Sequence, residues 1–141
     1  MSKISFSTLG TSGRLANQLF QVAATMAYAK KYSKDFTFPP WEYGIYFKTK
    51  FPPCAILVDK IYNEPTFEYT EIPFIEGDVD LSGYFQSPKH FENINIHELF
   101  SLNDEWRQYV TDLYNKINPK GLQACSIHVR RGDYLKEPHL S

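Results

Sequence analysis

The first part of the chain changes from a strand pattern to a helix pattern. In residues 3–9, KISFSTL, apolar side chains alternate with small polar ones, which is the period of a short β-strand. After Gly10 and Gly13, apolar residues recur every three or four positions, so we expect a helix over residues 14–32. A strand, a glycine turn and a long helix in this order predict the opening unit of an α/β fold.

The middle of the chain is less regular. Proline pairs occur at positions 39–40 and 52–53, and because proline has no N–H group to donate, we expect only short strands and loops there. Residues 79–86 predict a further strand, which leads through Ser87 and Pro88 into a short helix.

A second clear helix is predicted after this strand. Ser101 and Asp104 have the spacing of a capping box, in which side chains satisfy the unpaired N–H groups at a helix start. The apolar residues that follow recur every three or four positions. We expect them to form one buried helical face: Trp106, Tyr109, Val110, Leu113 and Ile117.

The pattern changes again after this helix. Asn118, Pro119 and Gly121 are expected to end it, and residues 124–130 alternate as in a strand. We therefore place the main internal boundary here, with one domain in residues 1–120 and the start of a second in residues 121–141.

Charge and composition exclude several classes of protein. Lys and Arg number 15 against 16 Asp and Glu, so the net charge of -1 gives no broad basic field for nucleic acid. The start of the chain lacks a secretion signal, and no apolar stretch is long enough for a membrane span, so we expect a cytoplasmic protein. Cys54 and Cys125 lie far apart, and we expect reduced, buried thiols without a disulfide framework.

A first candidate site lies in residues 10–21, GTSGRLANQLFQ. Glycines open a helix here, and the free N–H groups and positive dipole of a helix start suit a phosphate or carboxylate. Gly13, Arg14 and Asn17 would face the bound group. The glycines are equally compatible with a simple turn, since their spacing matches neither a dinucleotide fingerprint nor a P-loop. Amides at Asn17 and Gln18 within an apolar helix need partners, which favours a functional role.

A second candidate site is HVRRGDY, residues 128–134. A strand here delivers His128 and Arg130 into a glycine turn, and ligands of α/β proteins bind at strand ends. An arginine fork suits a diphosphate where no metal site is evident. The alternative is a surface arginine paired with Asp133. Cys125 and His128 have a C-x-x-H spacing, but no second ligand pair completes a zinc site, so we expect no metal.

A third candidate site is GYFQSPKHF, residues 83–91. Tyr84 and Gln86 place an aromatic face beside an amide, a combination that can contact a sugar. Core packing by Tyr84, Phe85 and Phe91 is the simpler interpretation, and on physical grounds alone we favour it.

Together and in this order, the three segments resemble the α-1,2-fucosyltransferases of glycosyltransferase family 11. GRLANQLFQ resembles the family's G-x-G-N-Q-(L/M)-F-Q segment, GYFQSPKHF its G-Y-F-Q-S-x-K-Y-F segment, and SIHVRRGDYL its H-x-R-R-G-D-Y signature. Ala16 stands where the family usually has glycine, and His90 where it usually has tyrosine. The resemblance covers about residues 7–135.

The resemblance implies a GT-B architecture, with a Rossmann-like N-terminal half followed by a GDP-fucose-binding domain. Because the family's enzymes are longer, only residues 122–141 would represent that second domain here. The implied reaction transfers L-fucose from GDP-fucose to the 2-hydroxyl of a terminal galactose, with inversion and without a cofactor or obligatory metal.

The resemblance also implies roles for individual residues. Arg130 would stabilise the charge that develops on the leaving diphosphate, and His128 would line the same crevice. Asp133 would hold the turn or an arginine, and Asn17 would reach the donor. Tyr84 and Gln86 are the expected acceptor contacts. No carboxylate can be singled out as the general base.

Two other functions remain open from the sequence. The chain could be a non-catalytic glycan or nucleotide binder that retains part of the cleft. It could also be an interaction protein that uses its aromatic surface.

Overall fold

A computed structural model describes residues 2–51, 53 and 60–129 of the chain. The chain divides into two compact units, Met1–Trp106 and Arg107–Ser141, and each is described by itself. This division falls inside the helix Asp104–Ile117. The domain assignment with a boundary after residue 120 stays a prediction.

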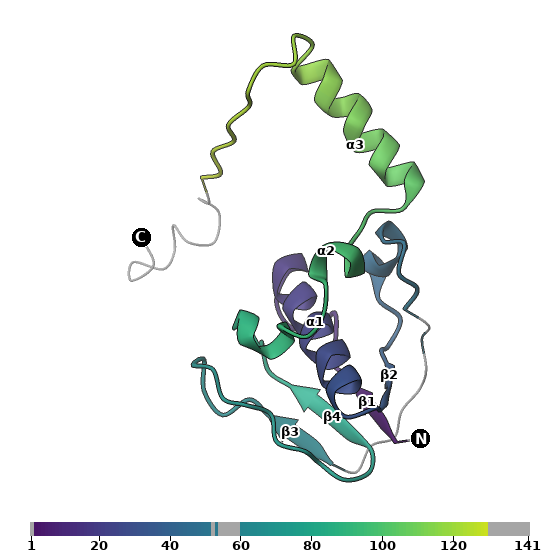
Figure 1. Cartoon of the computed structure of the whole chain (residues 1–141), viewed down its shortest axis with the longest axis vertical. Helices are drawn as coiled ribbons and strands as arrows, with labels where there is room; N and C mark the ends of the chain where they lie inside the picture. Colours follow the sequence, from purple (N-terminus) through teal and green to yellow (C-terminus); the bar gives the residue numbers. More distant parts are fainter. Residues whose placement is uncertain (1, 52, 54–59, 130–141) are drawn as a thin grey trace. The chain divides into compact units, whose positions relative to one another are not determined.

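The first unit is built on a parallel β-sheet, which in the described residues has four strands in the order β2-β1-β4-β3. The strands are β1 (Lys3–Ser5), β2 (Asp35–Thr37), β3 (Ile61–Asn63) and β4 (Val79–Ser82). Because parallel neighbours cannot be joined by a tight hairpin, helix α1 (Leu15–Lys31) crosses over from β1 to β2 (Figure 1). The predicted α/β class is confirmed.

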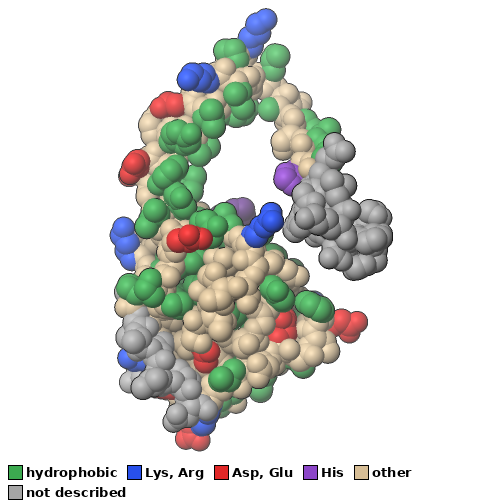
Figure 2. All heavy atoms as spheres, turned by 180° about the vertical axis from the view of Figure 1, so that it is seen from behind, with side chains coloured by type: hydrophobic (Ala, Val, Ile, Leu, Met, Phe, Trp, Pro, Cys, Tyr) green, Lys and Arg blue, Asp and Glu red, His purple; other side chains and the backbone are tan. Residues whose placement is uncertain are grey.

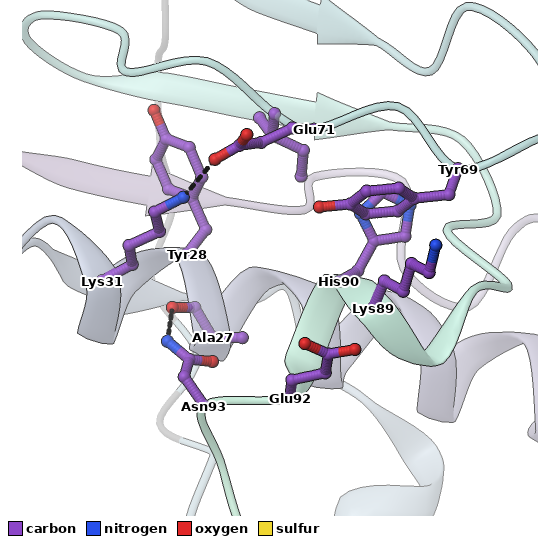
Figure 3. Close-up of a pocket in the computed structure, with 10 residues that line it drawn as sticks. Ala27, Tyr28, Lys31, Tyr69, Glu71, Lys89, His90, Glu92 and Asn93 are labelled. Carbon is purple, nitrogen blue, oxygen red and sulfur yellow. Dashed lines mark hydrogen bonds and ion pairs between the residues drawn. The ribbon is translucent and has the colours of Figure 1, made fainter.

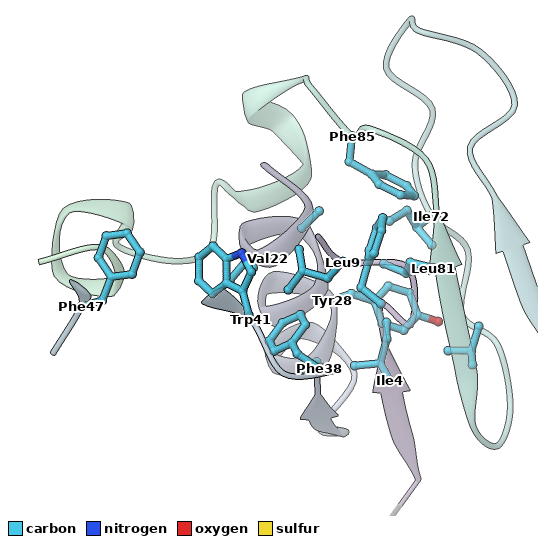
Figure 4. Close-up of a cluster of buried hydrophobic side chains, with 14 residues drawn as sticks. Ile4, Leu9, Val22, Tyr28, Phe38, Trp41, Phe47, Ile72, Leu81 and Phe85 are labelled. Atoms are coloured by element: carbon cyan, nitrogen blue, oxygen red, sulfur yellow. The ribbon is translucent and has the colours of Figure 1, made fainter. Parts of the chain in front are cut away.

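The helix predicted over residues 14–32 is confirmed by α1, which begins and ends within one residue of the expected limits. Val22, Ala23 and Ala27 face inward as the periodicity predicts, whereas Leu15 is 38% exposed. The core lies where α1 meets the sheet and contains fully buried side chains from strands, helix and loops (Figure 4). They include Ile4, Phe6, Val22, Phe38, Leu81 and Phe85.

Short helices lie between and after the strands. They are the 3-10 helices η1 (Glu42–Tyr46) and η2 (Pro88–Phe91) and the single-turn helix α2 (Ile96–Leu99). The predicted short helix after Pro88 is therefore confirmed as η2. Phe91 and Leu99 form a second small cluster with Ala23 and Ala27 of α1.

Both predicted strands of the first unit are shorter than expected. The strand expected over residues 3–9 ends at Ser5, and the strand expected over residues 79–86 ends at Ser82. Beyond Ser82, the carboxylate of Glu64 accepts the N–H groups of Tyr84 and Phe85, which a sheet ladder would otherwise need. The alternation therefore continues in the sequence after the strand pairing has ended.

The prediction of a capping box at Ser101 and Asp104 is wrong. The hydroxyl of Ser101 donates to the carbonyl of His97 at 2.7 Å, and the helix α3 (Asp104–Ile117) is capped by Asn103 instead. The side-chain oxygen of Asn103 accepts the N–H of Trp106 at 3.0 Å. Asparagine at the residue before a helix satisfies a free donor as well as serine does.

The prediction that one face of α3 is buried is also wrong. Val110, Leu113 and Ile117 are 48%, 47% and 74% exposed, and Figure 2 shows hydrophobic side chains along this helix. The period of three and four correctly predicts the helix. It does not specify a surface against which the apolar face packs.

The strand predicted over residues 124–130 is absent from residues 124–129, which have no regular secondary structure, and Arg130 lies outside the described residues. A strand is defined by hydrogen bonds to a neighbour, and the described strands pair only with one another. The expectation of a buried Cys125 is wrong as well, because this free thiol is exposed. Cys54 lies outside the described residues. No helix in the described part of the chain is long and apolar enough to cross a membrane.

Candidate functional site

Strands β1 and β4 are the two central strands of the sheet and run parallel, so their carboxyl ends lie side by side. We call the rim of the sheet at these two carboxyl ends the edge of β1 and β4. From β1 the chain crosses to β2 on one side, whereas the other neighbour of β4 is β3 on the opposite side. In open α/β sheets, ligands bind outside the carboxyl ends of the strands. The loop of residues 6–14 and the turn of residues 83–87 both leave the sheet here.

Asn17 and Gln86 join the first and third sequence motifs at this edge. The side-chain amide of Gln86 donates to the side-chain oxygen of Asn17 at 2.7 Å, across 69 positions of sequence. Asn17 is half-buried and Gln86 is exposed, so the pair lies where a ligand can reach it. The structure thus brings together two segments that the sequence analysis selected separately.

Gly13 makes room for Asn17. Its φ is +77°, and a Cβ atom placed on it would lie 2.4 Å from the side-chain nitrogen of Asn17. A side chain at position 13 would therefore displace the amide that contacts Gln86. Glycine at position 13 is therefore required for two reasons, the positive φ of the turn and the space that Asn17 occupies.

Two glutamines of α1, Gln18 and Gln21, link the helix to the loops at this edge. Gln18 accepts from the indole N–H of Trp41 at 2.8 Å and donates to the carbonyl of Gly13 at 3.0 Å. The amide of Gln21 donates to the carbonyl of Gly83 at 3.1 Å. The two contacts of Gln18 give this residue a structural role. The side-chain oxygen of Gln21 is buried and has no hydrogen-bond partner among the described residues.

Glu64, which the sequence analysis missed, fixes the turn after β4. Its carboxylate accepts the N–H of Tyr84 at 2.7 Å and that of Phe85 at 3.0 Å. Phe85 has a φ of +52°, an uncommon conformation for a bulky residue. Gly83 fits closely beneath, since an added Cβ would lie 2.5 Å from the Cβ of Glu64. Nothing in the local sequence marks Glu64, because its role depends on the pairing of β3 with β4.

Asp80 fixes the loop after β1 in a similar way. This buried carboxylate of β4 accepts from the hydroxyl of Ser5, and from the N–H and hydroxyl of Ser7 at 2.8 and 2.6 Å. Three donors compensate for the loss of water around the charge. Both loops that form the edge are therefore held by carboxylates, that of Asp80 within β4 and that of Glu64 directly after β3.

The aromatic residues of the third motif divide between core and surface. Phe85 and Phe91 are buried, as the core-packing interpretation predicts. Tyr84 is half-buried, and its ring stacks on Phe67 at 6.2 Å. Tyr84 thus stays partly accessible, whereas Gln86 is exposed and contacts Asn17.

The start of α1 has no acidic residue beside its positive end. Arg14 is the residue before the helix, its side chain makes no capping hydrogen bond, and α1 has no acidic residue in its first turn. The side chain of Arg14 is exposed. A helix start of this kind attracts an anionic group.

The residues of the HVRRGDY motif are only partly described. His128 is exposed in the segment that follows α3. Arg130 and Asp133 lie outside the described residues, and their expected roles stay predictions. Within the described residues, no group of three His, Cys, Asp or Glu side chains could hold a metal ion.

Chemically, this edge offers amide and hydroxyl groups, a positive helix end and an aromatic ring. These groups can bind polar ligands and orient them. No family model matches the chain, and neither a curated protein nor a solved structure matches it.

Proposed function

We propose that this protein is an α-1,2-fucosyltransferase of GT-B type, which transfers L-fucose from GDP-fucose to the 2-hydroxyl of a terminal galactose with inversion. The observation that carries the proposal is the 2.7 Å hydrogen bond between Asn17 and Gln86. Asn17 belongs to the segment expected to reach the donor, and Gln86 to the segment expected to contact the acceptor. A group-transfer enzyme gains rate by holding its two substrates next to each other, and this contact supports such an arrangement.

The donor end of the proposed site is the start of α1. The positive end of α1, which has no acidic residue in its first turn, and the exposed residue Arg14 before it provide local positive charge. The chain as a whole has a net charge of -1, so attraction of the GDP diphosphate has to be local. This position meets that requirement at the edge of the sheet where ligands of α/β proteins bind.

The chemical step assigned to the HVRRGDY motif follows from the family resemblance. The bond between fucose C1 and the β-phosphate oxygen breaks as the bond to the galactose 2-oxygen forms, the proton of the 2-hydroxyl passes to a general base, and negative charge collects on GDP. A fixed cation beside that phosphate stabilises the transition state more than the ground state. Arg130 is the proposed cation, with His128 lining the crevice and Asp133 holding the turn.

The test is fucose transfer to a galactoside by the 141-residue chain, measured with labelled GDP-fucose. The proposal predicts transfer, with kcat/KM lowered at least tenfold in Asn17→Ala and in Gln86→Ala. Removing the cation in Arg130→Ala should cost about 10²-fold or more. Gln108→Ala is the matched control, because Gln108 is an exposed glutamine of α3 whose amide bonds Asp112.

Two results would contradict this proposal. The first is a folded chain that transfers no fucose to any terminal galactoside. The second, which removes the role of Arg130 alone, is unchanged turnover in Arg130→Ala.

The exposed apolar face of α3 favours a second candidate, an interaction protein. Val110, Leu113 and Ile117 are accessible on one amphipathic helix, and accessible apolar faces mark contact surfaces. This candidate predicts binding of a hydrophobic dye or concentration-dependent self-association, both reduced in Leu113→Glu. A monodisperse monomer that binds no dye would exclude it.

A further inference from the structure

A cleft of about 340 Å³ lies apart from the edge formed by β1 and β4. Its walls come from α1, from the segment that contains Tyr69 and Glu71, and from residues 89–93 at and after η2 (Figure 3). Asn17, Gln21 and Gln86 do not line it. Its volume is at the lower end of the range for small-molecule sites.

One wall of this cleft is aromatic. The rings of Tyr69 and His90 lie 4.9 Å apart, and the ammonium of Lys89 lies 5.3 Å from the centre of the Tyr69 ring. Tyr69 is 40% exposed, and Figure 3 shows its hydroxyl directed toward the interior of the cleft. The wall therefore offers flat apolar carbon together with a phenol group.

The opposite wall offers polar groups with capacity for further hydrogen bonds. The amide nitrogen of Asn93 donates to the carbonyl of Ala27 at 3.0 Å, which leaves its oxygen as an acceptor. The carboxylate of Glu92 has no hydrogen-bond or ion-pair partner among the described residues, and Glu92 is one of the residues that line the cleft (Figure 3). Tyr28, by contrast, is fully engaged at the base, where its hydroxyl donates to Pro73 and accepts from Ile75, each at 3.0 Å.

The charges around the cleft balance. Lys31 and Glu71 form an ion pair at 2.5 Å, and Lys89 and Glu92 contribute one charge of each sign. Burial lowers the pKa of His90, although nearby Glu64 acts in the opposite direction, and this burial disfavours a positive charge on the imidazole. A balanced cleft does not favour a diphosphate or another strong anion.

We propose that this cleft binds a neutral sugar residue, with the ring packed against the Tyr69 wall and its hydroxyl groups bonded to Glu92 and Asn93. A sugar ring has a face of C–H groups and a rim of hydroxyl groups, and this wall and these acceptors match both. The cleft is a saccharide subsite separate from the edge of β1 and β4. It requires no transferase activity, so it goes beyond the function proposed above.

The test is titration of lactose and maltose into the isotope-labelled 141-residue chain, followed by two-dimensional NMR. We expect saturable shifts at Tyr69, His90 and Asn93 in the millimolar range, because an open cleft covers only part of a sugar. Tyr69→Ala should weaken binding at least about fivefold, and Tyr69→Phe should retain most of it. Tyr114→Ala is the control, because Tyr114 is 44% exposed on α3, close to the 40% of Tyr69.

Each other outcome overturns the inference. Shifts confined to Tyr84 and Gln86 would place the sugar at the edge of β1 and β4, and no shifts with either sugar would leave the cleft without a saccharide. Saturable shifts of the cleft residues with inorganic pyrophosphate would mean an anion site. Binding of GDP is expected to be unchanged in Tyr69→Ala, so failure of the subsite and failure of the proposed transferase are distinguishable.

Discussion

The helices α1 and α3 have the same apolar period but different surroundings. Val22 of α1 is completely buried against the sheet, whereas Val110 of α3 is 48% exposed. The helix α3 is anchored at its first turn, where Asn103 caps it and Trp106 packs on Tyr46 at 4.6 Å. The comparison teaches that periodicity predicts a helix and its apolar face, while burial depends on a surface that fits that face.

The largest predicted difference between the two units is at their glycines. Gly83 has a positive φ, and a Cβ would meet Glu64 at 2.5 Å, whereas a Cβ on Gly121 would meet nothing within 4 Å. We expect Gly83→Ala to lower the free energy of unfolding by about 3 kcal/mol. Gly121 also has a positive φ, but since no atom lies near its Cβ position, Gly121→Ala should cost only about 1 kcal/mol. Urea unfolding measures both, and equal costs would mean that the turn after β4 is not closely packed.

A smaller difference is predicted for one substitution made in both helices. Val22→Ala removes two fully buried methyl groups and should cost about 2 kcal/mol in the free energy of unfolding. Val110→Ala should lie within about 0.5 kcal/mol of the wild type, because the side chain is accessible and alanine favours helix. Thermal unfolding of the two variants measures this. A large loss in Val110→Ala would show that α3 is covered in solution.

The smallest predicted effect is a dependence of stability on pH in the first unit. Burial lowers the pKa of His90 in the folded chain, so below about pH 6.5 the unfolded chain takes up a proton that the folded chain resists. Stability is therefore fully present above that pH and falls as the pH drops toward the lowered pKa. His90→Phe keeps a ring and should flatten the unfolding profile between pH 7 and about pH 5.5. An unchanged profile would remove His90 as its cause.

The sequence predicts well those features that depend on local pattern. The limits of α1 follow from its periodicity, and the short helix after Pro88 follows from the proline start. Strand lengths were overestimated, because alternation continues beyond Ser82 where Glu64 takes over the backbone donors. The strand order, and with it the position of Glu64, depends on long-range pairing that no short segment specifies.

The candidate site was predicted in its parts but not in its connections. The first motif stands out for the glycines that open a helix and the third for aromatic residues beside an amide. The contact of Asn17 with Gln86 and that of Gln21 with Gly83 depend on the fold. Amides inside an apolar helix were the usable signal, because buried amides need partners. For Gln18 that signal identified a structural contact with Trp41 instead of a ligand site.

The most direct test of the central claim is calorimetric titration of GDP-fucose into the 141-residue chain. If the edge of β1 and β4 is the donor side of a fucosyltransferase, the titration saturates in the micromolar range, about -8 kcal/mol. Binding then weakens at least tenfold in Asn17→Ala, and Gln108→Ala binds as the wild type does. A folded chain that gives no heat with GDP-fucose, or equal affinity in Asn17→Ala and the wild type, would contradict the claim.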